Sequence, residues 1–253
     1  MSRLRLIARL DVKAPFLIKG VRLEGLRKLG NPHDFALRYY AAGADEILYI
    51  DSVASLYERN TILDLVERTA EDVFIPITVG GGIRTLDDAR AMLRAGADKL
   101  AVNTAAIRRP ELIRNIAQCF GSQCMVLGIE AKTIGNGRWE CYVENGREKT
   151  GIDVVEWAQR GQALGAGEIL LTSVDQEGTR NGFDVALVRT ISNAVTIPVI
   201  ASGGMGTPEH LLQVVENGKA DAVAMAHVLH YEQLSLPNIR AMARAKGHTL
   251  RAA

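Results

Sequence analysis

The sequence predicts an α/β fold, a single (β/α)8 TIM barrel built from two fused half-barrels. Short apolar segments alternate with amphipathic segments along the whole chain, which is the pattern of parallel strands joined by crossover helices. The length of 253 residues is close to the usual size of about 250 residues for this barrel. A glycine-bearing stretch also occurs twice, which indicates two similar halves.

The strands and helices can be placed in order. Eight apolar segments are predicted as strands: 4–10, 46–50, 75–79, 99–102, 125–129, 168–172, 198–201 and 222–226. Eight segments between and after them are predicted as helices: 32–42, 62–70, 86–95, 110–120, 154–164, 185–193, 208–216 and 237–246. Asn31-Pro32 and Thr207-Pro208 place a cap residue before a proline at the first helical position. We expect one domain, 1–253, with half-barrels of about 1–121 and 122–253.

Composition limits the possible functions. Hydrophobic residues make up 47% of the chain, which is enough for a large core. The net charge is +1, from 30 basic and 29 acidic residues without a basic run, so we expect no nucleic-acid partner. Three cysteines without Cys-x-x-Cys spacing indicate reduced thiols in a cytoplasmic protein. No apolar run reaches the roughly 18 residues of a membrane span, so we expect no membrane partner.

The repeated stretch contains a glycine turn between a strand and a helix. Residues 75–84 read Ile-Pro-Ile-Thr-Val-Gly-Gly-Gly-Ile-Arg, and residues 197–204 read Ile-Pro-Val-Ile-Ala-Ser-Gly-Gly. The two copies lie 122 positions apart, as do the similar stretches 43–48 and 165–170. Glycines at such a turn let backbone N–H groups approach an anion. The alternative is a tight turn without a ligand.

The two turns predict two phosphate-binding cradles. Active-site groups of this barrel come from the C-terminal ends of its strands, so the cradles are expected on opposite sides of one mouth. We expect a small, elongated ligand with a phosphate at each end. The expected binding residues are Lys19, Gly81, Gly82, Asn103, Thr104, Thr172, Gly178, Thr179, Gly203, Gly204, Ala226 and His227. Lys19 belongs to the basic segment 13–30, which we predict to be a loop that acts as a lid, with a solvated surface loop as the alternative. Segment 133–150 is predicted to be a β-hairpin.

Two carboxylates are the candidate catalytic groups. Asp11 and Glu130 end the first predicted strand of each half, so they are expected to face each other near the centre of the mouth. One could donate a proton while the other removes one; the alternative is that each carboxylate caps a turn. The five histidines are scattered without a cysteine or carboxylate cluster, and we predict neither a metal nor a cofactor.

Longer motifs carry a resemblance that spans essentially the whole chain. They are Leu10-Asp-Val-Lys13, Lys19-Gly-Val21, Gly43-Ala-Asp-Glu46, Gly80-Gly-Gly-Ile-Arg84, Phe120-Gly-Ser-Gln-Cys124, Gly165-Ala-Gly-Glu-Ile-Leu-Leu-Thr-Ser173 and Ile200-Ala-Ser-Gly-Gly204. With them the sequence resembles the cyclase subunits of imidazole glycerol phosphate synthase, more closely than it resembles the isomerase of the same pathway.

The resemblance implies a reaction and a partner. The substrate would be phosphoribulosylformimino aminoimidazole carboxamide ribotide (PRFAR), converted with ammonia to imidazole glycerol phosphate and aminoimidazole carboxamide ribotide (AICAR) in histidine biosynthesis. The ammonia would come from a glutaminase subunit docked at the N-terminal face of the barrel as a heterodimer. The family's catalytic aspartates fall on Asp11 and Glu130. Its ammonia gate falls on four charged residues, for which a structural salt-bridge ring is the other interpretation: Arg5, Glu46, Lys99 and Glu168.

The chain departs from the family's pattern on its functional face. Glu130 replaces an aspartate, Arg9 stands where a cysteine is usual, Ala14-Pro15-Phe16 replaces a common glycine turn, and His227 replaces a small hydroxyl residue. A displacement of about 1 Å at a catalytic group costs on the order of a hundredfold in rate. A second hypothesis is therefore a cyclase-like paralogue that binds a glutaminase and supplies ammonia to a sugar amidotransferase in surface-polysaccharide biosynthesis.

Overall fold

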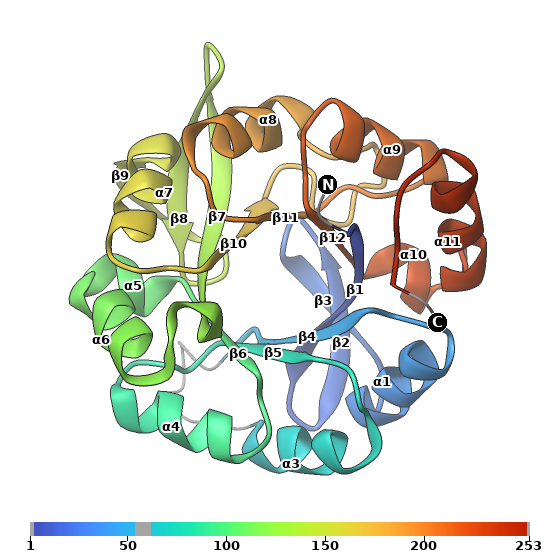
Figure 1. Ribbon diagram of the computed structural model, residues 1–253, viewed down its shortest axis with the longest axis horizontal. Helices are drawn as coiled ribbons and strands as arrows, with labels where there is room; N and C mark the ends of the chain where they lie inside the picture. Colours follow the sequence, from blue (N-terminus) through green and yellow to red (C-terminus); the bar gives the residue numbers. More distant parts are fainter. Residues whose placement is uncertain (1–2, 54–61, 252–253) are drawn as a thin grey trace.

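The centre of the molecule is a closed ring of eight parallel strands (Figure 1). This computed structural model describes residues 3–53 and 62–251; residues 1–2, 54–61 and 252–253 of the expected domain lie outside the described residues. The ring strands are β1 (Arg5–Lys13), β4 (Glu46–Asp51), β5 (Ile77–Gly80), β6 (Lys99–Val102), β7 (Met125–Gly135), β10 (Glu168–Ser173), β11 (Val199–Ser202) and β12 (Ala222–Met225). They pair in this order, and β12 pairs with β1 to close the ring. The predicted (β/α)8 barrel is confirmed.

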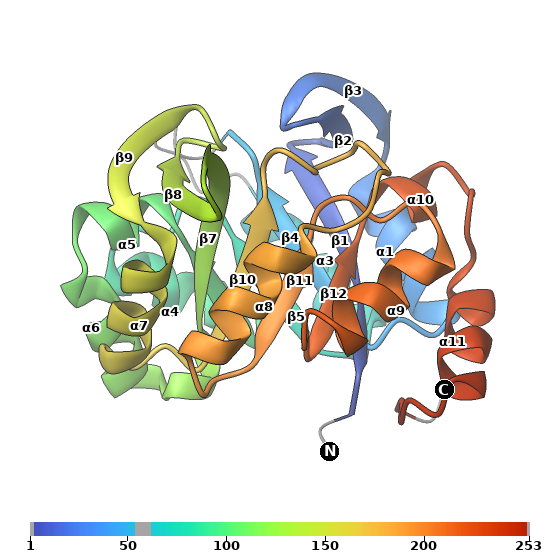
Figure 2. The same ribbon diagram turned by 90° about the horizontal axis from the view of Figure 1, so that it is seen from above.

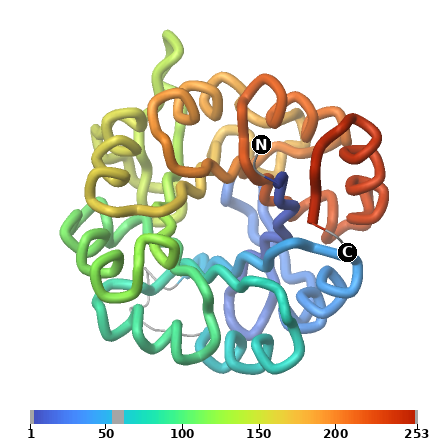
Figure 3. The backbone as a smooth tube through the Cα atoms, viewed as in Figure 1, coloured from blue at the N-terminus to red at the C-terminus, as the bar shows by residue number. Residues whose placement is uncertain are grey.

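Helices surround the ring and follow the strands in chain order (Figure 3). The main ones are α1 (Pro32–Ala41), α3 (Leu63–Asp72), α4 (Leu86–Arg94), α6 (Glu111–Phe120), α7 (Val154–Ala163), α8 (Val185–Ala194), α9 (Pro208–Glu216) and α11 (Leu236–Ala245). Shorter helical segments are α5 (Thr104–Arg108), η1 (Ser122–Cys124) and α10 (His227–His230). The Asn31 side chain caps α1, and Thr85 forms a capping box with Asp88 at α4, as their residue types favour. Within the described ranges, no helix has the length and apolar character needed to cross a membrane.

Two antiparallel extensions rise from one end of the barrel (Figure 2). The strands β2 (Phe16–Val21) and β3 (Glu24–Gly30) form a hairpin that continues from β1. The prediction of a loop over 13–30 was therefore wrong, because this segment completes an antiparallel ladder on the end of β1. Strands β8 (Arg138–Val143) and β9 (Glu148–Asp153) extend β7 in the same way. The hairpin predicted over 133–150 is confirmed and continues three residues further.

Alternate residues of the ring strands face two different cores. One apolar cluster joins strand residues such as Leu6 and Leu10 to the surrounding helices. A second cluster contains strand residues only, and it fills the barrel interior: Ile7, Leu48, Ala101, Val126, Leu170, Ile200, Ala222 and Ala224. Because side chains alternate along a strand with a period of two, Arg5, Ile7, Arg9 and Asp11 of β1 all point inward. The charged residues among them lie below and above the interior apolar layer.

The two glycine turns have matching geometry. Gly81 and Gly203 have φ angles of 92° and 95°, in the region that glycine adopts without a Cβ penalty. A Cβ at Gly81 would lie 2.4 Å from the Asp51 carbonyl oxygen, and one at Gly203 would lie 2.8 Å from that of Ser173. Each turn therefore packs against the end of the preceding ring strand of its own half, as two related half-barrels would require. The half-barrel boundary near 121 stays a prediction.

Candidate active site

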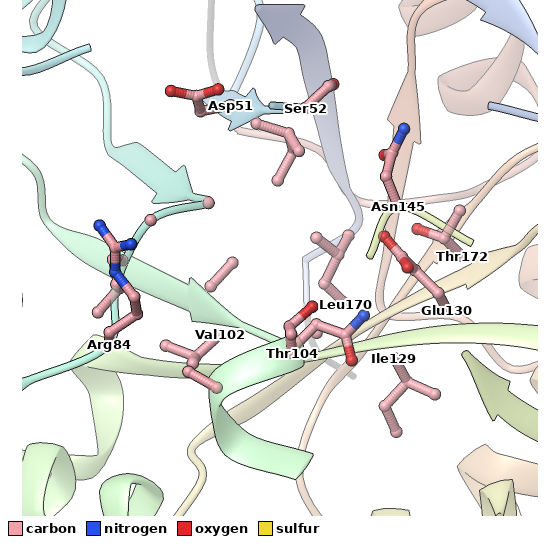
Figure 4. Close-up of a pocket in the computed structure, with 18 of the residues that line it drawn as sticks. Asp51, Ser52, Arg84, Val102, Thr104, Ile129, Glu130, Asn145, Leu170 and Thr172 are labelled. Carbon is pink, nitrogen blue, oxygen red and sulfur yellow. The ribbon is translucent and has the colours of Figure 1, made fainter. Parts of the chain in front are cut away.

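A cavity of about 380 Å³ opens at the C-terminal ends of the ring strands. Gly81 and Gly82 line it on one side and Glu130 and Thr172 on another, with Asn103 and Thr104 between them. Figure 4 shows the side chains of Glu130, Asn145 and Thr172 grouped together, with Arg84 across the cavity from them. The four residues of the first predicted cradle therefore share one cavity with a candidate catalytic carboxylate.

A second, smaller cavity of about 20 Å³ lies beside the other glycine turn. Its lining includes the second predicted cradle and Gly178: Gly178, Gly203, Gly204, Ala226 and His227. Burial, followed by the nearby Arg180 and Lys19 charges, lowers the pKa of His227. The imidazole is therefore neutral at pH 7 and can donate one hydrogen bond. Thr179 lines neither cavity, and its hydroxyl instead donates to the Gln176 carbonyl at 2.8 Å.

Glu130 and Asp51 are the carboxyl groups that line the larger cavity, and Glu130 is the one on the inward-facing side of a ring strand beside Thr172. Its position at the end of the inward-facing series of β7 is opposite Thr172 of β10. Burial raises the pKa of Glu130 to about 7, although the Gly146 N–H, which donates to its Oε2 at 2.8 Å, and the Arg9 charge act in the opposite direction. A carboxyl group with this pKa can both give and accept a proton near neutral pH.

Asp11 is held in a buried ionic network instead. It accepts hydrogen bonds from Arg9 Nε at 2.8 Å and from Lys19 Nζ at 3.1 Å, and Lys19 is also paired with Glu177. Burial by itself would raise the pKa of Asp11, but the charges of Arg9 and Lys19 hold it well below its ordinary value. Asp11 is therefore a permanent anion at neutral pH.

The two predicted carboxylates do not share the cavity. Glu130 lines the larger cavity, whereas Asp11 and Lys19 line neither one and are each 3% exposed. The guanidinium of Arg9 acts on both, since it contacts Asp11 directly and its charge lowers the pKa of Glu130. The expected symmetrical pair is thus an unequal pair that interacts with the same cation.

The four residues of the predicted gate form a closed ring of alternating charge at the N-terminal ends of the strands. Arg5 Nη1 donates to Glu46 at 3.0 Å, and its Nη2 contacts Glu168. Lys99 Nζ donates to Glu46 at 2.9 Å and to Glu168 at 3.0 Å. The Arg5 side chain is 26% exposed and the Glu46 side chain 2%, so the ring separates the outside from the apolar barrel interior.

Some polar residues of the site were not among the predicted ones. Arg9 lines both cavities, Asn145 lines the larger one, Ser202 lines the smaller one, and Glu177 pairs with Lys19. Arg9 could have been found from the strand period, because Arg5 and Asp11 can both face inward only if Arg9 does. Glu177 and Asn145 lie in loops, where no period identifies the inward side chains.

The histidine and carboxylate side chains of the described residues show no grouping typical of a metal centre. Across residues 3–53 and 62–251, no three His, Cys, Asp or Glu side chains are grouped so that they could hold a metal ion. His230 accepts or donates a 2.6 Å hydrogen bond with the Tyr39 hydroxyl through Nδ1, as a packed histidine does.

Comparison with known proteins agrees with this geometry. Residues 5–235 match the family model described as histidine biosynthesis protein. The chain is 66% identical over 209 residues to the protein named imidazole glycerol phosphate synthase subunit HisF from Legionella pneumophila, with 83% of this chain and 99% of the relative covered. The chain therefore belongs to the histidine biosynthesis protein family, as a relative of its imidazole glycerol phosphate synthase HisF subunits.

Proposed function

We propose that the chain is the cyclase subunit of an imidazole glycerol phosphate synthase, an enzyme that converts PRFAR with ammonia to imidazole glycerol phosphate and AICAR. The observation that carries the proposal is the larger cavity, in which the Gly81–Gly82 turn and Glu130 occupy one continuous surface. A second glycine turn beyond Arg9 can hold the other phosphate of an elongated ligand. The family match and the HisF relative support the cyclase rather than the sugar-amidation paralogue.

The two carboxylates have different roles in this proposal. Glu130 gives a proton to, and takes a proton from, the reacting atoms, because its pKa of about 7 allows both. Asp11 remains ionised and fixes the charges of Arg9 and Lys19. The glycine turns and Asn103-Thr104 hold the phosphates, so that the middle of the substrate lies beside Glu130.

A glutaminase subunit is the expected partner, and the ring of Arg5, Glu46, Lys99 and Glu168 is the expected entry point for ammonia. The ring supports docking at the N-terminal face because it lies on the barrel axis, at the end opposite the cavities. Ammonia released there would pass the interior apolar layer to reach Arg9 and Glu130.

The proposal is tested with the purified chain, PRFAR and an excess of ammonium salt, with AICAR formation as the measured product. We expect turnover by the wild-type chain and a loss of about 10²–10⁴-fold in Glu130→Gln. Binding of PRFAR without turnover would reject the cyclase and leave the ammonia-supplying paralogue as the explanation.

A further inference from the structure

One nitrogen of the Arg9 side chain has no hydrogen-bond partner among the described residues. Its Nε donates to Asp11, and its Nη1 donates to the hydroxyls of Thr172 at 3.0 Å and Ser202 at 2.9 Å. The residue is 3% exposed. Its Nη2 donates to no residue within 3–53 or 62–251, so this buried guanidinium keeps free N–H groups.

The position of Arg9 determines which partners those N–H groups can reach. Arg9 is the charged residue that lines both the larger and the smaller cavity. The interior apolar layer, which includes Ile7, lies beneath it, so water in the cavities and a bound ligand are its available partners. Since Arg9 lines both cavities, the middle of a ligand anchored at both glycine turns would lie beside Arg9.

The hydroxyl contacts of Arg9 go beyond what charge balance requires. Arg9 and Lys19 are the two cations that balance the Asp11 and Glu177 carboxylates, and the bonds to Thr172 and Ser202 carry no charge. Thr172 stands beside Glu130 on one side and beside Ser202 on the other. The two hydroxyls therefore fix the guanidinium plane next to Glu130, whose pKa is raised to about 7.

We propose that Arg9 is a further catalytic residue, whose Nη2 donates a hydrogen bond to the central carbonyl oxygen of the bisphosphorylated substrate. This inference rests on the proposed function. The ammonia lone pair forms the new C–N bond while the carbonyl π pair moves onto the oxygen beside Nη2. Glu130 gives its proton to that oxygen and takes one back from the nitrogen, so a neutral carbinolamine forms and Glu130 is unchanged. A fixed, buried cation at a developing oxyanion acts mainly on the transition state.

The inference predicts a loss in kcat with little change in substrate binding. The variants are Arg9→Lys, which keeps a charge near Asp11 but lacks Nη2, and Arg9→Ala, which removes the whole guanidinium. The control is Arg90→Ala on the exposed face of α4, where Arg90 pairs with Asp87. Loss of one preorganised donor is expected to lower kcat by about 10²–10³-fold, while KM and the Kd for the substrate without ammonia stay within about threefold of wild type.

A second measurement separates a chemical role from a structural one. Added guanidinium chloride should restore part of the kcat of Arg9→Ala and leave wild type and Arg90→Ala unchanged. Circular dichroism shows which variants fold. If Arg9→Ala does not fold, the kcat of Arg9→Lys tests the role of Arg9. Wild-type kcat in folded Arg9→Lys, or a loss confined to KM, overturns the inference alone. Absence of turnover by the wild-type chain overturns the proposed function, and the role of Arg9 with it.

Discussion

Arg9 Nε lies 2.8 Å from Oδ1 of Asp11, and both residues are 3% exposed. This ion pair, together with Lys19, keeps Asp11 ionised, whereas Glu130 at the corresponding place in the other half has a pKa of about 7. Two carboxylates in related positions therefore have different protonation behaviour, which is how proteins separate acid–base roles. The difference can be tested in the activity and in the stability of the protein.

The ammonia-dependent rate should depend on a group that titrates near pH 7. If protonated Glu130 is the acid that reaches the substrate first, kcat/KM, corrected for the fraction of neutral ammonia, is constant below about pH 7 and falls above it. In Glu130→Gln this limb should be absent from whatever activity remains. The measurement is a pH profile of both proteins, and an identical limb in the variant would assign the titration to another group.

The same carboxyl should make stability depend on pH. The pKa of Glu130 is raised from 4.5 to about 7 in the folded protein, so folding favours the protonated carboxyl. The stability that this carboxyl contributes is fully present below pH 4.5, its ordinary pKa. This contribution is lost as the pH rises through about 7. Glu130→Gln should therefore gain in Tm relative to wild type between about pH 5 and pH 9, as measured by thermal unfolding. The exposed Glu148→Gln is the control, and an equal gain there would contradict the assignment.

Much of this molecule could be predicted from its sequence because the information is local. The short apolar segments, such as Lys99–Val102, and the caps at Asn31 and Thr85 determine the alternating elements. The hairpin β2–β3 could not be predicted, because its strands depend on pairing with the end of β1. The contacts of Arg9 join positions separated by 163 and 193 residues in the sequence. No local sequence pattern indicates contacts between residues so far apart in the chain.

Lys19 should matter for stability as well as for activity. It is the common partner of the buried Asp11 and Glu177 carboxylates, so Lys19→Met would leave a buried charge without compensation. Breaking a buried ion pair in this way costs about 3–5 kcal/mol. Urea unfolding of Lys19→Met, with the exposed Lys149→Met as control, measures the loss. A cost equal to that of the control would mean that Arg9 alone is sufficient for the network.

The first glycine turn should not tolerate a side chain. Gly81→Ala would place a Cβ 2.4 Å from the Asp51 carbonyl oxygen at a φ of 92°. Gly137→Ala is a matched control, since its φ is 66° and nothing lies within 4 Å of its Cβ. Both variants carry the backbone penalty, but only Gly81→Ala adds a clash of about 1–3 kcal/mol. We expect the larger loss of stability, and a raised KM, in Gly81→Ala; equal effects in the two variants would remove the argument for a shaped cradle.

The charged ring at the opposite end of the barrel should control ammonia that arrives from a partner, but not ammonia added to the solution. Lys99 Nζ bridges Glu46 and Glu168, so Lys99→Met opens the ring and leaves two carboxylates facing Arg5. With the glutaminase bound, glutamine-supported turnover should fall severalfold relative to turnover with ammonium salt. The exposed Lys219→Met, just before β12 at the same end, controls for loss of surface charge. If both kinds of turnover fall together in Lys99→Met, the ring holds the barrel together rather than gating it, because a structural defect lowers activity whatever the source of ammonia.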